Sequence, residues 1–260
     1  MCAILWLCVT EVAGGNLAAV LDPDSLERLV PDEVRVGDTT GEESLRLSLE
    51  RYEFAATHAR AGRVLDIACG VGFGTHLLAE RGGPAVDVLG VDLSEQAVRY
   101  AGERYGGDRA RFLAANAMEF SDGDGFDAII SIETIEHLPD PTRFLARLVS
   151  MLRPGGVLVG SVPVTPSVDA NPHHLHDFSE RSFRRLARGC GLVEFDAMRQ
   201  VQPFSLSAVL QRDEARMKEV RPGLPSYYLS HPDAFLRRCW STLRHGFSNR
   251  YLTLAWRAPA

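Results

Sequence analysis

Long hydrophobic runs, closely paired cysteines and clusters of basic residues are all missing from this chain of 260 residues. The apolar stretch at residues 3–9 has no basic segment before it, and it falls well short of the roughly 20 apolar residues that a membrane span needs. We therefore expect no membrane span. The five cysteines are scattered, odd in number and form no CxxC pair, which favours a reducing compartment over a disulfide framework. A cytoplasmic location follows as an expectation.

Positive charge is also in short supply, because 28 Lys and Arg residues face 34 Asp and Glu residues and leave a net charge of −6. Without a basic run, the broad electrostatic footprint of a nucleic-acid-binding protein is absent. What the chain does have is 45% hydrophobic and 24% charged residues, which is typical of an ordinary globular domain. The composition thus favours a small-molecule partner and leaves the oligomeric state open.

From residue 63 onward, short apolar runs alternate with helical stretches, and no internal repeat interrupts the alternation. This order predicts an α/β fold, a Rossmann-like and mostly parallel seven-stranded sheet with helices on both faces. The expected strands are 63–68, 87–92, 111–114, 126–132, 156–162, 192–201 and 251–256. The expected helices are 42–59, 75–81, 94–104, 141–152 and 179–188. The sequence 153–156, Arg-Pro-Gly-Gly, is expected to end a helix and turn into the fifth strand.

Composition also divides the chain. We expect an N-terminal extension at residues 1–40, a ligand-binding core at 41–203 and the last strand of that core at 248–260. Residues 204–247 between them are richer in Arg, Tyr, Trp and Pro. This segment predicts a helical insertion or lid before the last strand. Its Tyr227, Tyr228, Trp240 and arginines would recognise a second ligand.

A glycine turn carries the first functional inference. The strand around Asp66 ends in the pattern Gly70-x-Gly72-x-Gly74, which opens a helix at the carboxyl edge of the sheet. About 20 residues later, Asp92 ends the next strand, where an acid accepts hydrogen bonds from a ribose. Dinucleotide sites instead use Gly-x-Gly-x-x-Gly for a pyrophosphate. The acid at Asp66 would suit a cationic amino acid group, which favours S-adenosylmethionine over a nicotinamide cofactor.

With these motifs in this order, the chain resembles the class I S-adenosylmethionine-dependent methyltransferases, in the branch of the ubiquinone-type O-methyltransferases. The resemblance covers residues 51–191 and implies S-adenosylmethionine as the cofactor. It assigns Gly70 and Gly72 to the methionine part, Asp92 to the ribose hydroxyls and Leu93 to the adenine flank. The implied cofactor-binding set also includes Tyr52, Asp66, Ala68, Asn116, Ala117 and Met118. Asn116 departs from the usual Asp of the family, and Tyr52 has packing as an alternative role.

Carboxylates and histidines follow the fourth and fifth strands. Glu133, Glu136 and His137 have the i, i+3, i+4 spacing of one helical face, and His173, His174 and His176 come after the fifth strand. Such groups can hold Mg²⁺ or another divalent cation. By resemblance, the metal ligands would be Glu133, Glu136, His137 and His176. Without a metal, the candidate catalytic residues are His137, His174, His176 and Glu133, with an imidazole as the general base.

These residues predict a methyltransferase that acts on a small-molecule acceptor, through O-methylation of a sugar or natural-product hydroxyl. Alternatives are an N- or C-methyltransferase, a small-RNA 2′-O-methyltransferase, a binder that keeps the cofactor site without catalysis, or a nucleotide-dependent oxidoreductase. RNA is disfavoured by the acidic balance. The arginines at 181–188 could contact phosphates, but a solvent-exposed helix face is the simpler interpretation.

Overall fold

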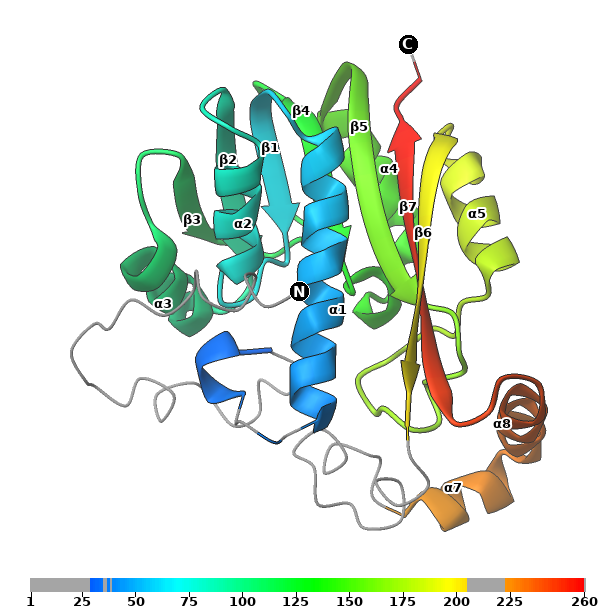
Figure 1. The fold of residues 1–260 in the computed structure, drawn as a ribbon. Coiled ribbons are helices and arrows are strands. Elements are labelled where there is room, and N and C mark those ends of the chain that lie inside the picture. Colours follow the sequence, from blue (N-terminus) through cyan, green and yellow to red (C-terminus); the bar gives the residue numbers. More distant parts are fainter. Residues whose placement is uncertain (1–28, 35–36, 38, 205–222, 260) are drawn as a thin grey trace.

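The computed structural model describes residues 29–34, 37, 39–204 and 223–259 (Figure 1). Its strands are β1 (Gly62–Ile67), β2 (Val86–Asp92), β3 (Ala110–Ala114), β4 (Phe126–Ile132), β5 (Leu152–Pro163), β6 (Val193–Pro203) and β7 (Ser248–Arg257). The α-helices are α1 (Thr39–His58), α2 (Phe73–Arg81), α3 (Glu95–Tyr105), α4 (Pro141–Met151), α5 (Glu180–Gly189), α7 (Leu224–Ser230) and α8 (Pro232–His245). Two 3₁₀ turns, η2 (Pro31–Glu33) and η3 (Ile135–His137), complete the order.

The sheet has seven strands in the order β3-β2-β1-β4-β5-β7-β6. Strands β1 to β5 pair in parallel, whereas β7 runs antiparallel to both β5 and β6. The predicted Rossmann-like, mostly parallel sheet is confirmed. The direction of winding reverses between β1 and β4, and open α/β sheets bind ligands in the crevice at such a reversal.

Helices cover both faces of the sheet (Figure 1). On one face, alanines of α1 and Leu78 of α2 pack on Val64 and Ile130 of the sheet. On the other face, Phe144 of α4 and Phe183 of α5 pack on Trp256 of β7 and its neighbours. The central strands β1 and β4 are therefore buried from both sides, as parallel strands inside a sheet require, whereas the edge strands β3 and β6 are largely exposed.

Local signals explain why the predicted boundaries lie close to the observed ones. The Ser94 hydroxyl accepts the amide of Ala97 at the start of α3, and Ser179 with Ser182 forms a reciprocal capping box at α5. One expectation needs correction: residues 153–156 do not precede the fifth strand but lie within it. The ladder pairs Phe126 with Leu152 and resumes at Ala128 with Val157, so the Pro-Gly-Gly sequence forms an irregularity inside β5.

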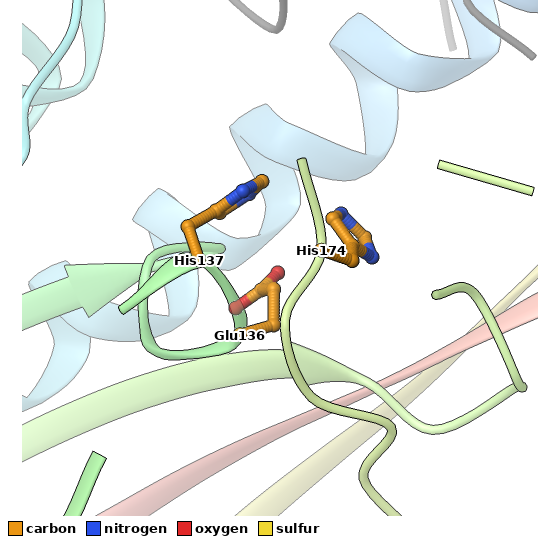
Figure 2. Close-up of side chains that lie close together, drawn as sticks. All are labelled: Glu136, His137 and His174. Carbon is orange, nitrogen blue, oxygen red and sulfur yellow. The ribbon is translucent and has the colours of Figure 1, made fainter. Parts of the chain in front are cut away.

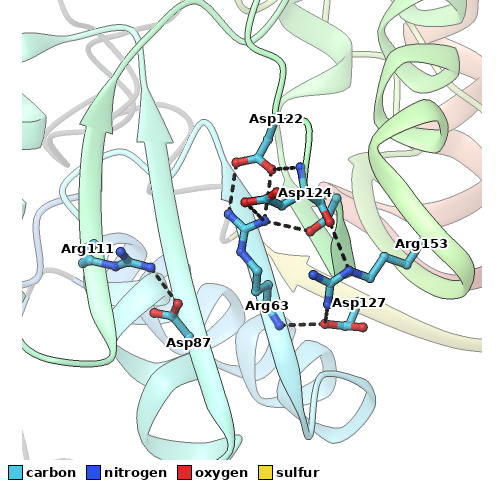
Figure 3. A network of polar contacts seen from close by, with 8 residues as sticks. Arg63, Asp87, Arg111, Asp122, Asp124, Asp127 and Arg153 are labelled. Atoms are coloured by element: carbon cyan, nitrogen blue, oxygen red, sulfur yellow. Dashed lines mark hydrogen bonds and ion pairs between the residues drawn. The ribbon is translucent and has the colours of Figure 1, made fainter.

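The amino-terminal edge of the sheet carries an ion-pair network (Figure 3). The Arg63 guanidinium donates two parallel hydrogen bonds of 3.0 Å to the carboxylate of Asp122, which lowers the pKa of that carboxyl. The Arg63 amide and the Arg153 side chain both donate to Oδ2 of Asp127, at 2.8 and 2.6 Å. These contacts join β1, β4 and β5 at the edge opposite the carboxyl ends of the strands, so their role is structural.

The insertion before the last strand contributes α7 and α8, while residues 205–222 of the predicted lid lie outside the described residues, as do residues 1–28 of the predicted extension. A buried carboxylate connects the insertion to the loop after β5. Asp169 accepts a 2.6 Å hydrogen bond from the Tyr228 hydroxyl and two from Arg238, at 2.9 and 2.5 Å. In the part of the chain that the structure describes, no helix is both long and apolar enough to cross a membrane.

Candidate functional site

A cavity of about 400 Å³ opens at the carboxyl ends of β1, β2 and β4, where the winding of the sheet reverses. One end is lined by the turn after β1 and by the ends of β2 and β3. The other end is lined by residues after β4, by α1 and by β6 and β7. The lining residues used below are Arg51, Tyr52, Ala68, Cys69, Gly70, Asp92, Leu93, Asn116, Ala117, Glu133, Thr134, His137, His173, Gln202 and Tyr251. The cavity therefore spans both regions that the sequence singled out.

The three glycines of the turn have three different roles. Gly70 has a φ of +58° and faces open space at the position of a missing Cβ, so its backbone can touch a ligand directly. Gly72 has a φ of +85° and begins α2, and a Cβ there would meet Ala101 and Phe112. Only Gly70 of these two lines the cavity. Gly74 lies under the ring of Tyr52, where a Cβ would come within 2.0 Å of the ring Cζ.

Asp92 stands at the end of β2, facing the glycine turn. Its Oδ2 accepts the amide of Gly70 and its Oδ1 accepts the amide of Ser94, both at 2.9 Å. These two backbone donors hold the carboxylate at the cavity wall. Next to it, Leu93 is an apolar side chain that is 71% exposed on the cavity side, a surface suited to a flat aromatic base. Both residues line the cavity next to the glycine turn.

Asp66 does not line the cavity but lies buried behind it. Its carboxylate accepts a 2.6 Å hydrogen bond from Thr75 and a 3.3 Å hydrogen bond from the Tyr52 hydroxyl. Burial raises the pKa of Asp66 to about 7, although these two hydrogen bonds favour the ionised form. Tyr52, from α1, does line the cavity and lies edge-on to Phe73. Asp66 thus contacts the cavity wall through Tyr52 and does not line the cavity itself.

Backbone strain marks the same place. Among the described residues, Ala68 and Glu133 are the non-glycine residues with positive φ, at 61° and 50°. They follow β1 and β4, the strands that flank the reversal, and both line the cavity. Because this conformation is unfavourable for residues with a Cβ, such strain concentrates at functional sites.

The segment after β3 contributes less than the sequence predicted. Asn116 and Ala117 line the cavity, but Met118 packs against the hydrophobic core instead. The side-chain oxygen of Asn116 accepts the amide of Met118 at 2.9 Å, which forms a local turn at the cavity edge. Cys69 also lines the cavity, and burial raises the pKa of its thiol well above the ordinary value, which leaves it unreactive.

Polar side chains occupy the other end of the cavity. Glu133 accepts a 2.8 Å hydrogen bond from Ser161, and its other oxygen lies 3.7 Å from the guanidinium of the buried Arg51. Arg51 also donates to Gln200 at 2.8 Å and lies over the ring of Tyr251, 4.3 Å from its centroid. Glu133 is therefore fixed by a hydroxyl and a guanidinium.

The predicted histidines separate into two groups (Figure 2). Glu136, His137 and His174 lie close together, with one ligand atom from each within 4.8 Å of the others. His137 Nδ1 donates to the carbonyl of His173 at 3.2 Å, and His174 Nδ1 lies 2.7 Å from the Ser167 hydroxyl. His176 instead donates from Nε2 to the carbonyl of Leu138 at 2.9 Å.

Of the predicted metal ligands, Glu136 and His137 thus come together with His174 rather than with Glu133 and His176. Of the predicted catalytic residues, His137 and Glu133 line the cavity, whereas His174 and His176 do not. The His174 ring contacts the ring of His137 edge-on, with 4.7 Å between the centroids. In a neutral His137 the Nδ1 proton is donated to a carbonyl, so the free lone pair of the ring is on Nε2. This nitrogen can accept a proton or bind a metal.

Several cavity residues had no recognisable signal in the sequence. Arg51 lies next to Tyr52 on α1, whereas Gln202 and Tyr251 belong to β6 and β7. Tyr251 donates to Gln202 at 3.0 Å, and Gln202 donates to Ser44 of α1 at 2.9 Å. This buried polar seam joins α1 to the antiparallel end of the sheet and forms part of the cavity wall.

Comparisons with known proteins agree with this geometry. Residues 64–156 match the model of a methyltransferase domain. A probable S-adenosylmethionine-dependent methyltransferase of Mycolicibacterium smegmatis is 32% identical over 54% of this chain and 61% of its own length. A ubiquinone biosynthesis O-methyltransferase of Methylococcus capsulatus is 35% identical over 42% of this chain and 47% of its own length. The chain therefore spans less than two thirds of these curated relatives.

Among solved structures, the N-methyltransferase NodS of Bradyrhizobium japonicum aligns with a TM-score of 0.56 at 18% identity. The alignment covers 84% of this chain and 98% of that protein. At this level of identity the match concerns the fold alone.

Proposed function

We propose that this chain, a class I S-adenosylmethionine-dependent methyltransferase whose residues 64–156 match a methyltransferase domain, methylates the oxygen of a small-molecule hydroxyl, such as that of a sugar or natural product. The observation that carries the proposal is the continuity of the cavity. Its nucleoside end, with Gly70, Asp92 and Leu93, opens into an end that presents Glu133 and His137. When bound, S-adenosylmethionine supplies a methyl group on a positively charged sulfur.

The chain's own residues then act at both ends of the cavity. Asp92 would accept hydrogen bonds from the ribose hydroxyls. Gly70 would let the backbone approach the amino acid part of the cofactor, and Tyr52 of α1 would close over it. At the other end, His137 Nε2 would take the proton of the acceptor hydroxyl, while Glu133 and Arg51 orient it. Because displacement at a methyl group is in line, alignment of the acceptor and exclusion of water are the main requirements.

The cofactor end is tested by calorimetric titration of S-adenosylhomocysteine into wild type and Asp92→Ala. We expect the substitution to weaken binding by about a hundredfold, because it removes a carboxylate that bonds the ribose and orders the Gly70 turn. Asp87→Ala is the matched control. Asp87 lies on the same strand but pairs with Arg111 away from the cavity, so this change should leave the affinity unaltered. Equal affinities for wild type and Asp92→Ala would contradict the assignment.

Methyl transfer itself is tested with labelled S-adenosylmethionine and a panel of sugars, phenols, carboxylic acids and amines. Transfer to hydroxyl acceptors that falls by about 10²-fold or more in His137→Ala supports the proposed base. Transfer to amines alone would overturn O-methylation. A protein that binds S-adenosylhomocysteine tightly but transfers to no acceptor would instead be a binder without catalysis.

We further propose that Glu136, His137 and His174 can hold a divalent cation beside the acceptor. One carboxylate and two imidazoles can together bind a divalent transition-metal cation such as Mn²⁺, and their mutual distances are short enough for one ion. The contacts of both Nδ1 atoms with oxygen partners orient the rings in the way that metal-binding histidines require. The ion would lower the pKa of an acceptor hydroxyl and so take over part of the role of the base.

His174 and His176, two positions apart in the sequence, allow a matched test of this metal site. Titration of Mn²⁺ or Mg²⁺ should show binding that His174→Ala and Glu136→Gln weaken by about tenfold or more, with His176→Ala and Glu133→Gln close to wild type. Loss of binding in His176→Ala with retention in His174→Ala would restore the ligand set expected from the family resemblance. If wild type binds neither ion, His137 acts without a metal.

A further inference from the structure

Helix α8 presents an apolar stripe to solvent. Leu236, Trp240 and Leu243 have the i, i+4, i+7 spacing of one helical face, and their exposed fractions are 66%, 67% and 83%. On the opposite face, Ala234 is buried and Arg238 binds Asp169, so the helix is already attached to the body of the protein by its other side. The helix lies at the periphery of the molecule, beside the start of β7 (Figure 1). Its apolar face is therefore not needed to hold it in the fold.

A basic cleft adjoins this stripe. The cleft has a volume of about 380 Å³, and its polar lining consists of Arg237, Ser241, Arg244, His245 and Arg250, with Trp240 as the aromatic member. No carboxylate belongs to the described residues that line it. Arg250 lies 3.2 Å from the His245 ring, and desolvation together with Arg250 and Arg244 lowers the pKa of that imidazole. Asp233 pairs with Arg237 at the outer edge, which leaves the inner cleft positively charged.

We propose that this surface, the α8 stripe with its adjoining cleft, docks on an anionic phospholipid bilayer. Apolar side chains with a central tryptophan, flanked on one side by arginines, are the composition of helices that lie in the plane of a membrane interface. The leucines would enter the acyl boundary, and the arginines of the cleft would bind lipid phosphates. A second copy of the chain is the weaker occupant, because a symmetric contact would bring two positive clefts face to face.

Helix α8 is also connected to the acceptor end of the cavity through a buried carboxylate. Arg238 of α8 and Tyr228 of α7 hold Asp169, which belongs to the same loop as His173 and His174. A bilayer bound to the stripe would lie on the opposite side of α8 from this loop, and the Arg238–Asp169 pair would link the docked helix to the loop that carries the acceptor-side histidines. This inference does not depend on the methylated atom, because vesicle binding is measured without catalysis.

Flotation of the full chain with vesicles tests the proposal. We expect the chain to float with mixed phosphatidylcholine–phosphatidylglycerol vesicles and not with phosphatidylcholine alone. Leu236→Ser/Leu243→Ser and Arg237→Gln/Arg244→Gln should each lower the partition coefficient, the second by about fivefold per arginine. The matched control is Arg181→Gln/Arg185→Gln on α5, which removes the same charge from another exposed helix face and should leave partition unchanged. Retained S-adenosylhomocysteine affinity shows that each variant is folded.

Other occupants give distinct results. Binding of inorganic phosphate by calorimetry, with no flotation, would make the cleft a site for a soluble phosphate and overturn docking on a bilayer. A dimer by light scattering that Leu236→Ser/Leu243→Ser dissociates, again without flotation, would assign the stripe to a second copy. Flotation that requires deletion of residues 1–28 would mean that the chain's own N-terminal segment covers the stripe. An equally large fall in the partition coefficient of the α5 control would show that binding depends on net charge alone and not on the α8 surface.

Discussion

Replacing Gly74 with alanine should destabilise the protein by about 3 kcal/mol and weaken S-adenosylhomocysteine binding, although alanine ordinarily stabilises a helix by about 1 kcal/mol relative to glycine. Gly74 lies in the first turn of α2, and a Cβ there would come within 2.0 Å of Cζ and 2.3 Å of both Cε atoms of the Tyr52 ring. The ring is 5% exposed and cannot move outward without losing its place at the cavity wall. Chemical denaturation and calorimetric titration measure the two effects.

The partner residue provides the decisive control. In a Tyr52→Ala background the obstacle is gone, so Gly74→Ala should become neutral or stabilising, a reversal of sign within one double-mutant cycle. Tyr52→Phe should not rescue, because the clashing atoms are ring carbons rather than the hydroxyl. Gly102→Ala in α3, where nothing lies within 4 Å of the added carbon, should simply stabilise the protein. A destabilisation by Gly74→Ala that persists in the Tyr52→Ala background would show that the ring is not its cause.

The fold was predictable because its signals are local. Capping by Ser94 and Ser179 begins α3 and α5 where the sequence predicted, and the acidic end of β2 at Asp92 is observed at its predicted place. The glycine pattern located the ligand turn, but its third member could not be interpreted from sequence. Gly74 must lack a side chain because the Tyr52 ring lies against it. Tyr52 belongs to α1, which precedes β1, whereas Gly74 follows β1, so no local pattern connects the two residues.

The acceptor end of the cavity was less predictable for the same reason. Arg51, Gln202 and Tyr251 meet only because α1 packs against the antiparallel strands at the far end of the sheet. The choice between His174 and His176 also depends on contacts across loops. The His176 ring donates to the Leu138 carbonyl and does not join the cluster of Glu136, His137 and His174. Such a contact leaves no periodic signal in an irregular segment.

The second large effect is a loss of stability of the ligand-free protein as the pH rises from about 4 to about 7. Burial raises the pKa of Asp66 from 3.8 to about 7 in the folded chain. The folded state therefore retains a proton that the unfolded state releases above pH 4, and the unfolded state binds fewer protons across this window. The stabilisation is complete below the unfolded pKa and is lost as the pH passes through the folded one. The difference between these two pKa values corresponds to about 4 kcal/mol in the free energy of unfolding.

Comparison of wild type with Asp66→Asn isolates this contribution, because the amide does not ionise and still accepts the hydrogen bond from Thr75. Urea unfolding at a series of pH values should show that the wild type loses stability relative to the variant as the pH rises. Asp122→Asn should give the opposite sign, since Arg63 lowers the pKa of Asp122 and its carboxylate stabilises the folded chain at higher pH. Background titrations are common to all three proteins and cancel in the differences. Parallel curves for wild type and Asp66→Asn would mean that Asp66 is already ionised when buried. Its hydrogen bonds with Thr75 and Tyr52 would then outweigh desolvation.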